Sequence, residues 1–172
     1  MKMDKYRLHM KDFYHMRDFD RFMDEHLPNV KQEVDGLVFT PINEPIRIGT
    51  HETMFKWKPQ AKNTVDFLMK KEPSRETPGC VPGPPAWRLY VQEKGKLVYE
   101  SEIPQNRIDD KSWFEDGAIV ECMYVTWEEP LWWKPIKRRY DKTHPNNRRT
   151  FYRTIVNIKE NIKMEEFLNC KP

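Results

Sequence analysis

A proline- and glycine-rich segment near the middle of the chain most limits how these 172 residues can fold. Residues 72–85 read EPSRETPGCVPGPP. Proline lacks the backbone N–H that a helix interior or an inner strand requires, and glycine weakens both elements. Residues 73–85 are therefore predicted to be a linker between a first domain, residues 1–72, and a second domain, residues 86–172.

Before this linker, the hydrophobic pattern predicts one helix and three strands. Apolar side chains recur at helix-like intervals within residues 14–27, and Pro28 follows as a stop signal. Short runs of β-branched and aromatic residues, separated by turn residues, are typical of strands. These runs are residues 34–40, 54–58 and 64–69.

After the linker, the pattern predicts a hairpin, two further strands and a helix. The hairpin comprises residues 87–92 and 96–103, with the turn at Lys94-Gly95. The further strands are residues 118–127 and 132–140, and the helix covers residues 147–162. Several short strands followed by a helix favour a small OB-type barrel. We therefore expect an α+β chain, in which an open fragment of a larger mixed sheet precedes this barrel.

Composition narrows the class of protein. Charged residues make up 33% of the chain and aromatic residues 13%, which is typical of a folded chain and not of a disordered one. The three cysteines are far apart, so neither a disulfide framework nor a zinc site is expected. The sequence contains no apolar run of membrane-spanning length and no signal core at the N-terminus. We expect an intracellular protein without a membrane partner.

Two lysines and an aspartate give the first candidate site. Lys56 and Lys58 are separated by one residue, so on a strand both ammonium groups point to one face, while Trp57 points the other way, toward a core. Their mutual repulsion would be relieved by a nucleotide α-phosphate between them. Asp35 precedes Gly36, and its carboxylate could hold Mg²⁺ or Mn²⁺. The alternatives are an exposed polar strand face and an ordinary Asp-Gly turn.

Asp66 belongs to the strand that follows these lysines. The sequence predicts that this strand faces Lys56 and Lys58 across a tight turn at residues 59–62, where the carboxylate could orient one ammonium group. An ordinary cross-strand ion pair, worth about 0.2–1 kcal/mol, is the alternative.

A basic tract gives the second candidate site. The net charge is only +3, yet cationic residues crowd between residues 134 and 153, as on a phosphate-binding surface or a solvated basic face. Arg139, Asp141 and Lys142 form an R-x-D-K pattern whose planar fork and point charge could grip β- and γ-phosphates. Asn146 could hydrogen-bond the same group, although a surface turn explains Pro-Asn-Asn equally well.

Four short stretches together carry a family resemblance. They are DGLVFTP at residues 35–41, FKWKP at 55–59, NTVDF at 63–67 and RYDKTHPN at 139–146. In this order and spacing they resemble the later motifs of the mRNA capping guanylyltransferases of eukaryotes and large DNA viruses. The resemblance implies a nucleotidyltransferase domain with an ATP-grasp-like mixed sheet, joined to an OB-fold lid. It also implies transfer of GMP from GTP to a diphosphate RNA end through a lysyl-GMP intermediate.

The resemblance also assigns roles to the candidate residues. Asp35 would hold the Mg²⁺ or Mn²⁺ ion, and Lys56 and Lys58 would contact the α-phosphate of GTP. Arg139, Asp141 and Lys142 would be lid residues that orient pyrophosphate, with Asp66 and Asn146 in the nucleotide-binding set. Trp57 and Phe67 are expected to pack the sheet and not to touch guanine.

One departure from the family pattern matters for activity. The family's nucleophile lies in a K-x-D-G motif upstream of DGLVFTP, and neither this motif nor the acidic motif that follows it is present here. The chain is thus expected to be the carboxyl-terminal half of a guanylyltransferase, inactive without an amino-terminal half. It would act in the nucleus of a cell or, if viral, in the host cytoplasm, a viral factory or the virion.

Two other functions stay open at this point. One is a non-catalytic OB module that binds an RNA 5′ end or a capping partner, and the other is a fragment of an ATP-dependent polynucleotide ligase. An exposed apolar edge in the first domain would favour the guanylyltransferase fragment, because an orphan strand edge is otherwise a liability. A closed, self-sufficient first module would favour the binding module.

Overall fold

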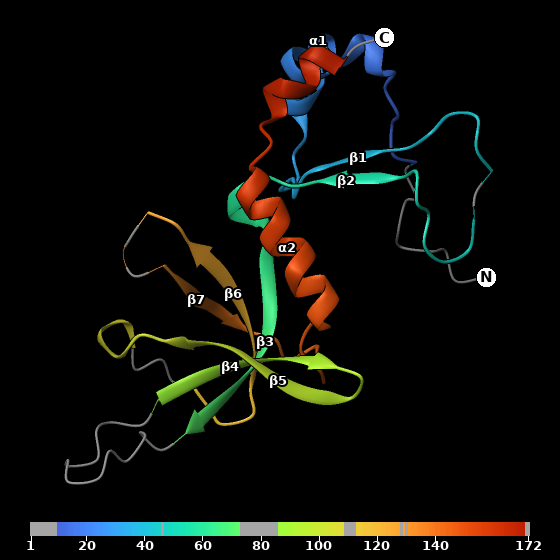
Figure 1. Cartoon of the computed structure of the whole chain (residues 1–172). Coiled ribbons are helices and arrows are strands. Elements are labelled where there is room, and N and C mark those ends of the chain that lie inside the picture. Colours follow the sequence, from blue (N-terminus) through green and yellow to red (C-terminus); the bar gives the residue numbers. More distant parts are fainter. Residues whose placement is uncertain are drawn as a thin grey trace, which may run out of the picture. The chain divides into compact units, whose positions relative to one another are not determined.

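The computed structural model describes residues 10–45, 47–72, 86–108, 113–127, 129 and 131–170, so the predicted linker at 73–85 lies outside the described residues. The chain divides into two compact units (Figure 1). One comprises Met1–Asp35 and Lys163–Pro172, and the other comprises Gly36–Ile162. None of the helices in the described part is long and apolar enough to cross a membrane.

The first unit is helical. Its first helical segment consists of a 3₁₀ turn η1 (Met16–Asp18), α1 (Phe19–Arg21), a π turn η2 (Phe22–His26) and a 3₁₀ turn η3 (Leu27–Asn29). The 3₁₀ helix η6 (Met164–Cys170) belongs to the same unit. Phe19 is buried between Phe22 and Phe167, with ring centroids 5.8 and 6.2 Å away. The helix predicted at residues 14–27 is confirmed, although Pro28 lies inside its last turn and not beyond it.

The second unit begins with a two-stranded ribbon. β1 (Leu37–Phe39) and β2 (Phe55–Trp57) pair antiparallel, with Leu37 opposite Trp57. Gly36 permits this pairing, because a Cβ there would lie 2.0 Å from the Trp57 carbonyl oxygen. Val38 and Phe55 remain 57% and 66% exposed, so the ribbon leaves apolar side chains in solvent.

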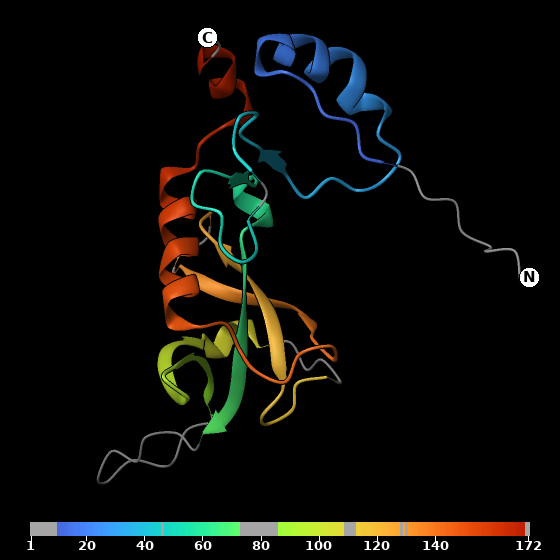
Figure 2. The same ribbon diagram turned by 90° about the vertical axis from the view of Figure 1, so that its right-hand side faces the viewer.

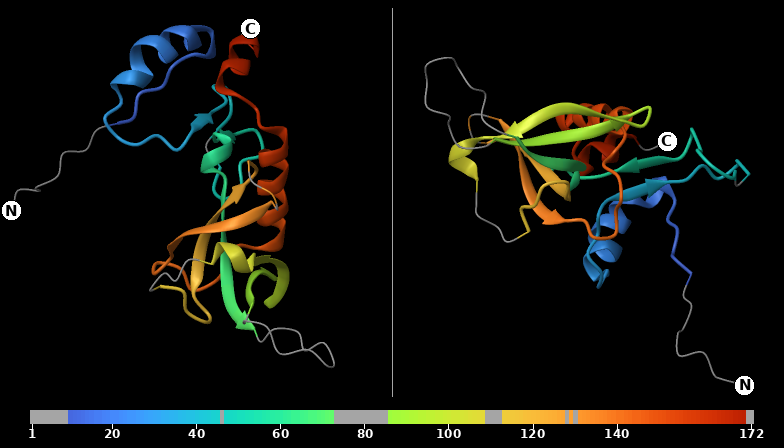
Figure 3. Two further views of the ribbon diagram at one scale, coloured as in Figure 1. Left: turned by 90° about the vertical axis from the view of Figure 1, so that its left-hand side faces the viewer. Right: turned by 90° about the horizontal axis from the view of Figure 1, so that it is seen from below.

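The rest of the second unit is built on a five-stranded antiparallel sheet (Figures 1 and 3). Its strand order is β5-β4-β3-β6-β7. The edge strands β5 and β7 contact each other, which curls the sheet in the manner of a small, partly open barrel of the OB type. This confirms the predicted α+β class. The strands are β3 (Thr64–Glu72), β4 (Ala86–Glu93), β5 (Lys96–Ile103), β6 (Ile119–Val125) and β7 (Trp132–Arg138).

The pairing of β3 differs from the prediction. The sequence predicted that β3 faces the lysine strand, and this is wrong, because β3 pairs with β4 and β6 while β2 pairs with β1. A domain boundary at residues 73–85 would cut this sheet, since Glu72 lies opposite Ala86. Proline and glycine mark where regular structure stops, but they do not reveal whether the flanking strands share a sheet.

The helix α2 (Arg148–Glu160) covers one side of the sheet, and Figure 2 shows it running along β3. Asn147 caps it, because its Oδ1 accepts a hydrogen bond from the Arg149 backbone N–H over 2.9 Å. Phe151 and Ile158 on its inner face are buried. The Phe151 ring lies 5.7 Å from the fully buried ring of Phe67, which confirms that Phe67 packs the core.

Candidate functional site

Arg139, directly after β7, lies at the centre of a group of acidic side chains. Its Nε and Nη2 donate to the two carboxylate oxygens of Asp141 over 2.9 and 2.8 Å. Its Nη1 donates to Asp66 on β3 over 2.9 Å and to Glu121 on β6 over 3.3 Å. We call these four residues the arginine cluster. The two-bond contact with Asp141 uses the geometry in which guanidinium groups bind carboxylates most strongly.

The register between β3 and β6 fixes the positions of two acidic residues of the arginine cluster, Asp66 and Glu121. Asp66 and Glu121 are directly opposite each other on β3 and β6, where two carboxylates would repel. The Arg139 guanidinium offsets this repulsion. Glu121 has two further contacts, because the Lys137 ammonium lies 3.1 Å away and the Thr64 hydroxyl donates to it over 2.8 Å. The site is therefore built by pairing between strands far apart in sequence.

Asn146 ties the loop after Arg139 to β3. Its Oδ1 accepts from the backbone N–H of Asp66 over 2.8 Å, and its own backbone N–H donates to the Asp66 carbonyl over 2.7 Å. The backbone N–H of Gln92 on β4 donates to the Asn146 carbonyl over 2.9 Å. A phosphate contact from Asn146 would have to use its Nδ2 donor, because its Oδ1 is an acceptor. Asn146, which the sequence predicts as a phosphate contact, thus positions the loop after Arg139 through these hydrogen bonds.

The electrostatics of the arginine cluster follow from burial and contact. Asp141 is exposed, and the hydrogen bond from Arg139 lowers its pKa from 3.8 to about 2. Asp66 is 7% exposed, and burial raises its pKa although Arg139 opposes the change. Burial would also raise the pKa of Glu121, but the contacts with Thr64 and Lys137 outweigh it, so that pKa is lowered.

These contacts define what the arginine cluster can do chemically. In this structure Nε, Nη1 and Nη2 of Arg139 all donate to carboxylates. A phosphate that approached the guanidinium from solvent would compete with Asp141, the exposed acid of the arginine cluster, and not with the buried Asp66. Lys142 is exposed and follows Asp141 directly, so its ammonium is available to the same anion. The structure thus groups Arg139, Asp141 and Asp66, with Lys142 beside them in sequence.

The lysine pair occupies the end of the ribbon. Lys56 lies on β2 and Lys58 directly follows it, and both are exposed. Trp57 between them is half-buried, and its Nε1 donates to the Ile162 carbonyl over 2.9 Å. Asn63, only 8% exposed, donates from its Nδ2 to the Lys58 carbonyl over 3.3 Å. The FKWKP and NTVDF stretches are therefore joined by a buried side chain that fixes the backbone at Lys58.

Asp35, the predicted metal ligand, offers a single carboxylate. It is the last residue of the first unit and is exposed. Mg²⁺ is commonly bound by one or two carboxylates together with phosphate oxygens, so one carboxylate is chemically sufficient where phosphates supply further ligands. Among the described residues, no group of three or more His, Cys, Asp or Glu side chains is arranged to hold a metal ion.

Sequence reasoning missed Glu121 and the structural role of Asn63. Glu121 is the charged residue of the strand IVECMYV, which is otherwise apolar or weakly polar. A carboxylate in such a run has to find a cationic partner when the strand is buried. That signal could have marked Glu121 as part of a buried ion-pair network, although it could not have named Arg139 as the partner.

Comparisons with known proteins give the family. Residues 1–60 match the model of the mRNA capping enzyme catalytic domain, and residues 62–168 match that of the mRNA capping enzyme C-terminal domain. The chain belongs to the mRNA capping enzyme family, as the sequence resemblance predicted. The boundary between the two matches falls just before β3, which keeps the five-stranded sheet whole. Both models describe capping enzymes, so they give no support to the ligase alternative.

Curated relatives agree with the family models. The chain is 29% identical over 162 residues to the mRNA-capping enzyme subunit alpha of Schizosaccharomyces pombe, covering 88% of this chain and 39% of the relative. It is 29% identical over 168 residues to the mRNA-capping enzyme of Caenorhabditis elegans, covering 92% and 25%. It is 32% identical over 117 residues to the mRNA-capping enzyme of Danio rerio, covering 68% and 18%. The chain therefore spans less than half the length of these relatives.

Proposed function

We propose that this chain is the carboxyl-terminal part of an mRNA capping guanylyltransferase that transfers GMP from GTP to a diphosphate RNA end. The transfer runs through a lysyl-GMP intermediate whose lysine is supplied by an amino-terminal half. The partners are GTP, the RNA 5′ end and that half, and the cofactor is Mg²⁺ or Mn²⁺. The relatives named above are eukaryotic, which supports action in the nucleus.

The open edges of the β1–β2 ribbon among the described strands are the observation that carries this proposal. A two-stranded sheet is marginally stable by itself, and open strand edges invite pairing with another chain. β1 and β2 pair only with each other among the described strands, and they leave Val38 and Phe55 largely exposed. Further strands of a nucleotidyltransferase sheet would cover these side chains. The same strands would carry the lysine nucleophile, whose K-x-D-G motif is absent from this sequence.

The residues of this chain would act on the phosphates of GTP. Lys56 and Lys58 would bind the α-phosphate, where negative charge develops during transfer. Arg139 and Lys142 would bind the β- and γ-phosphates and orient the departing pyrophosphate. A phosphate would then replace Asp141 as the hydrogen-bond partner of Arg139. Asp35 would hold a divalent ion, which when bound would neutralise phosphate charge. Closure of the sheet domain over the site would keep water from the lysine–phosphate bond.

A labelling experiment tests the proposal. The purified chain is incubated with α-labelled GTP and Mg²⁺ or Mn²⁺, alone and with the amino-terminal half, and then run on a denaturing gel. We expect label only on the amino-terminal half and only when both parts are present. Label on this chain alone would show that the nucleophile lies here. No label in either case would favour the alternative of a non-catalytic RNA-end binding module.

A matched pair of variants makes the experiment specific. Lys58→Ala should abolish label on the partner, because Lys58 would contact the reacting phosphate. Lys96→Ala removes the same charge from an exposed position on β5 and should leave labelling unchanged. Equal labelling with both variants would contradict the role proposed for Lys58.

A further inference from the structure

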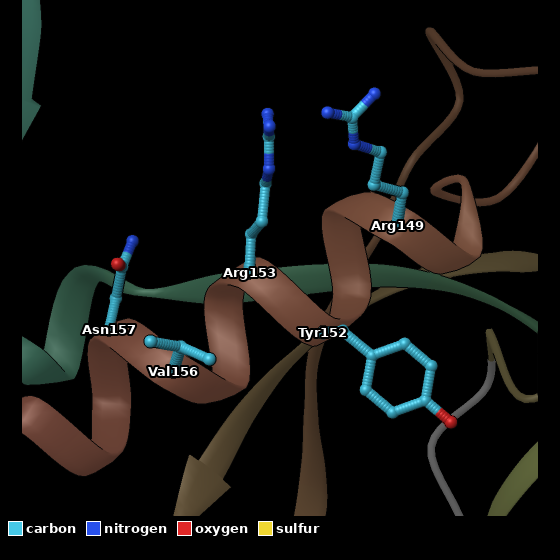
Figure 4. A pocket seen from close by; sticks show the side chains of 5 residues that line it. All are labelled: Arg149, Tyr152, Arg153, Val156 and Asn157. Atoms are coloured by element: carbon cyan, nitrogen blue, oxygen red, sulfur yellow. The ribbon is translucent and has the colours of Figure 1, made fainter.

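The outer face of α2 carries a pattern that neither the fold nor the phosphate site uses. Arg149, Arg153 and Asn157 recur every four residues, and Figure 4 shows the two arginine side chains projecting from the same side of the helix. Together with Tyr152 and Val156 they line an open pocket of about 550 Å³. We call these five residues the α2 outer face.

The charges of the α2 outer face are not balanced within the described part of the chain. Arg148, the preceding residue, is held by Glu100 at 2.7 Å and Glu93 at 3.2 Å. Neither Arg149 nor Arg153 forms an ion pair with a described residue, although like charges four residues apart destabilise a helix. The helix is anchored through its opposite, buried face, so these arginines are not needed for packing. Their arrangement suits an external anion.

The apolar members of the α2 outer face indicate which anion. Tyr152 and Val156 are 48% and 49% exposed and line the same pocket as the two arginines. The Arg148 guanidinium lies 5.4 Å from the centre of the Tyr152 ring, and the rest of the exposed ring surface is open to a base. Proteins that bind single-stranded nucleic acid combine cationic groups for the phosphates with aromatic surface for the bases. Side chains four residues apart have Cβ atoms about 5–6 Å apart, so two guanidinium groups can bind neighbouring phosphates of a flexible strand. An acidic peptide would use the charges but not the aromatic ring.

We propose that the α2 outer face binds single-stranded RNA, namely part of the transcript that accepts GMP. The helix starts directly after the loop of the arginine cluster, with Asn146 in the loop and Asn147 as the helix cap. RNA held along α2 would thus lie on the element that continues from the phosphate site. This inference rests on the proposed function for the identity of the RNA as the acceptor, while the binding itself is measured independently.

The test measures binding of a fluorescent single-stranded oligouridylate to the full chain by anisotropy over a series of salt concentrations. Each phosphate contact to a single strand contributes about 0.7 to the slope of log K against log salt. This slope is negative, and the double variant Arg149→Gln/Arg153→Gln should make it shallower by about 1.4. Because these contacts contribute little at about 1 M salt, the double variant should bind about 25-fold more weakly than the wild type at about 0.1 M salt. Lys31→Gln/Lys71→Gln is the matched control, because it removes two charges from exposed positions outside α2.

A second variant keeps the proposal testable if the double variant folds poorly. Asn157→Asp places an acid four residues after Arg153, where it repels phosphate, while its ion pair with Arg153 offsets its unfavourable position near the helix C-terminus. It should weaken RNA binding and leave the unfolding midpoint nearly unchanged. Equal affinity of the wild type, the double variant and Asn157→Asp would overturn the proposal. Binding of an acidic polypeptide but not of oligouridylate would overturn it as well.

The outcome is separable from that of the labelling experiment. RNA affinity that depends on the α2 outer face without GMP transfer would leave this inference standing and count against the proposed function. GMP transfer by the two assembled parts, with RNA affinity insensitive to the three substitutions, would do the reverse.

Discussion

The five-stranded sheet and the two-stranded ribbon use similar strands under opposite conditions. In the sheet, Phe67, Leu89 and Val120 are completely buried, and the central strand β3 is paired on both sides. In the ribbon, Val38 and Phe55 remain more than half exposed, and each described strand has one partner. The difference teaches that the sheet buries its apolar side chains within the described part of the chain, whereas the ribbon leaves apolar side chains exposed, as expected if the further strands that we propose pair with it.

Energetics sharpen this contrast. Full burial of a large apolar side chain stabilises a fold by about 1.5–3 kcal/mol. The sheet has many such side chains around Phe67 and Trp133, whose rings lie 5.2 Å apart. In the ribbon, Trp57 is half-buried and its Nε1 donates to the Ile162 carbonyl, whereas Val38 and Phe55 are mostly exposed. We therefore expect the sheet to carry most of the stability of the chain.

The largest expected effect compares two phenylalanines. Phe67→Ala should lower the free energy of unfolding by about 3–5 kcal/mol, because it empties a fully buried site among aromatic rings. Phe55→Ala, the matched change in the ribbon, should cost about 0.5 kcal/mol or less, because its ring is 66% exposed. Urea unfolding followed by circular dichroism measures both. Equal losses would mean that the ribbon belongs to the same cooperative core as the sheet.

A somewhat smaller effect is expected at the arginine cluster. Arg139→Ala leaves Asp66 buried without its cation, and loss of one partner of a buried pair costs about 3–5 kcal/mol. The Arg139 side chain is 21% exposed, so we expect a smaller cost than this range, about 2–3 kcal/mol. Lys142→Ala, at the neighbouring exposed cation, should change stability by about 0.5 kcal/mol or less.

The expected loss of stability in Arg139→Ala affects the choice of variant for testing the predicted role of the lid residues. The lid role alone predicts that Arg139→Ala acts on catalysis and leaves the fold intact, but the structure gives the same side chain a share in holding β3 and β6. Lys142→Ala is therefore the cleaner probe of phosphate binding. Unfolding curves of Arg139→Ala that coincide with those of the wild type would contradict the structural role.

Two glycine substitutions, one in the ribbon and one in the sheet, should have smaller effects that differ between the two regions. Gly36→Ala should break the ribbon, because the new Cβ would meet the Trp57 carbonyl oxygen at 2.0 Å. Gly95→Ala, in the β4–β5 turn, meets no atom within 4 Å and is penalised only through its φ of +78°, by about 1 kcal/mol. Amide exchange should quicken in β1 and β2 for the first variant alone. Faster exchange in the sheet for Gly36→Ala would contradict the independence of the two regions.

The smallest effect is a pH dependence from Asp141. Its pKa is about 2 in the folded chain against an ordinary 3.8, so its stabilising contribution is present above pH 3.8 and is lost as the pH falls toward 2. The raised pKa of Asp66 has the opposite sign, because its cost appears as the pH rises above 3.8. Carboxyl-carbon NMR titration should show the Asp141 pKa returning toward 3.8 in Arg139→Ala. An unchanged value would show that another group lowers it.

Much of the local structure could be predicted from the sequence. Each of the seven described strands overlaps its predicted run, because alternation and turn residues act over a few positions. The partner of β3 was predicted wrongly, because Thr64 pairs with Met123, far along the chain. Arg139 and Asp141 were grouped correctly since they are near neighbours. The contacts of Arg139 with Asp66 and Glu121 depend on sheet register, which no local pattern encodes.

Hydrogen exchange in β1 and β2, measured with and without the proposed amino-terminal half, tests the central claim most directly. The account predicts rapid exchange of these amides in the chain alone, slow exchange once the two parts are mixed, and no change in β3 to β7. Ribbon amides that are already as protected as those of β3, or that do not respond to the amino-terminal half, would contradict it.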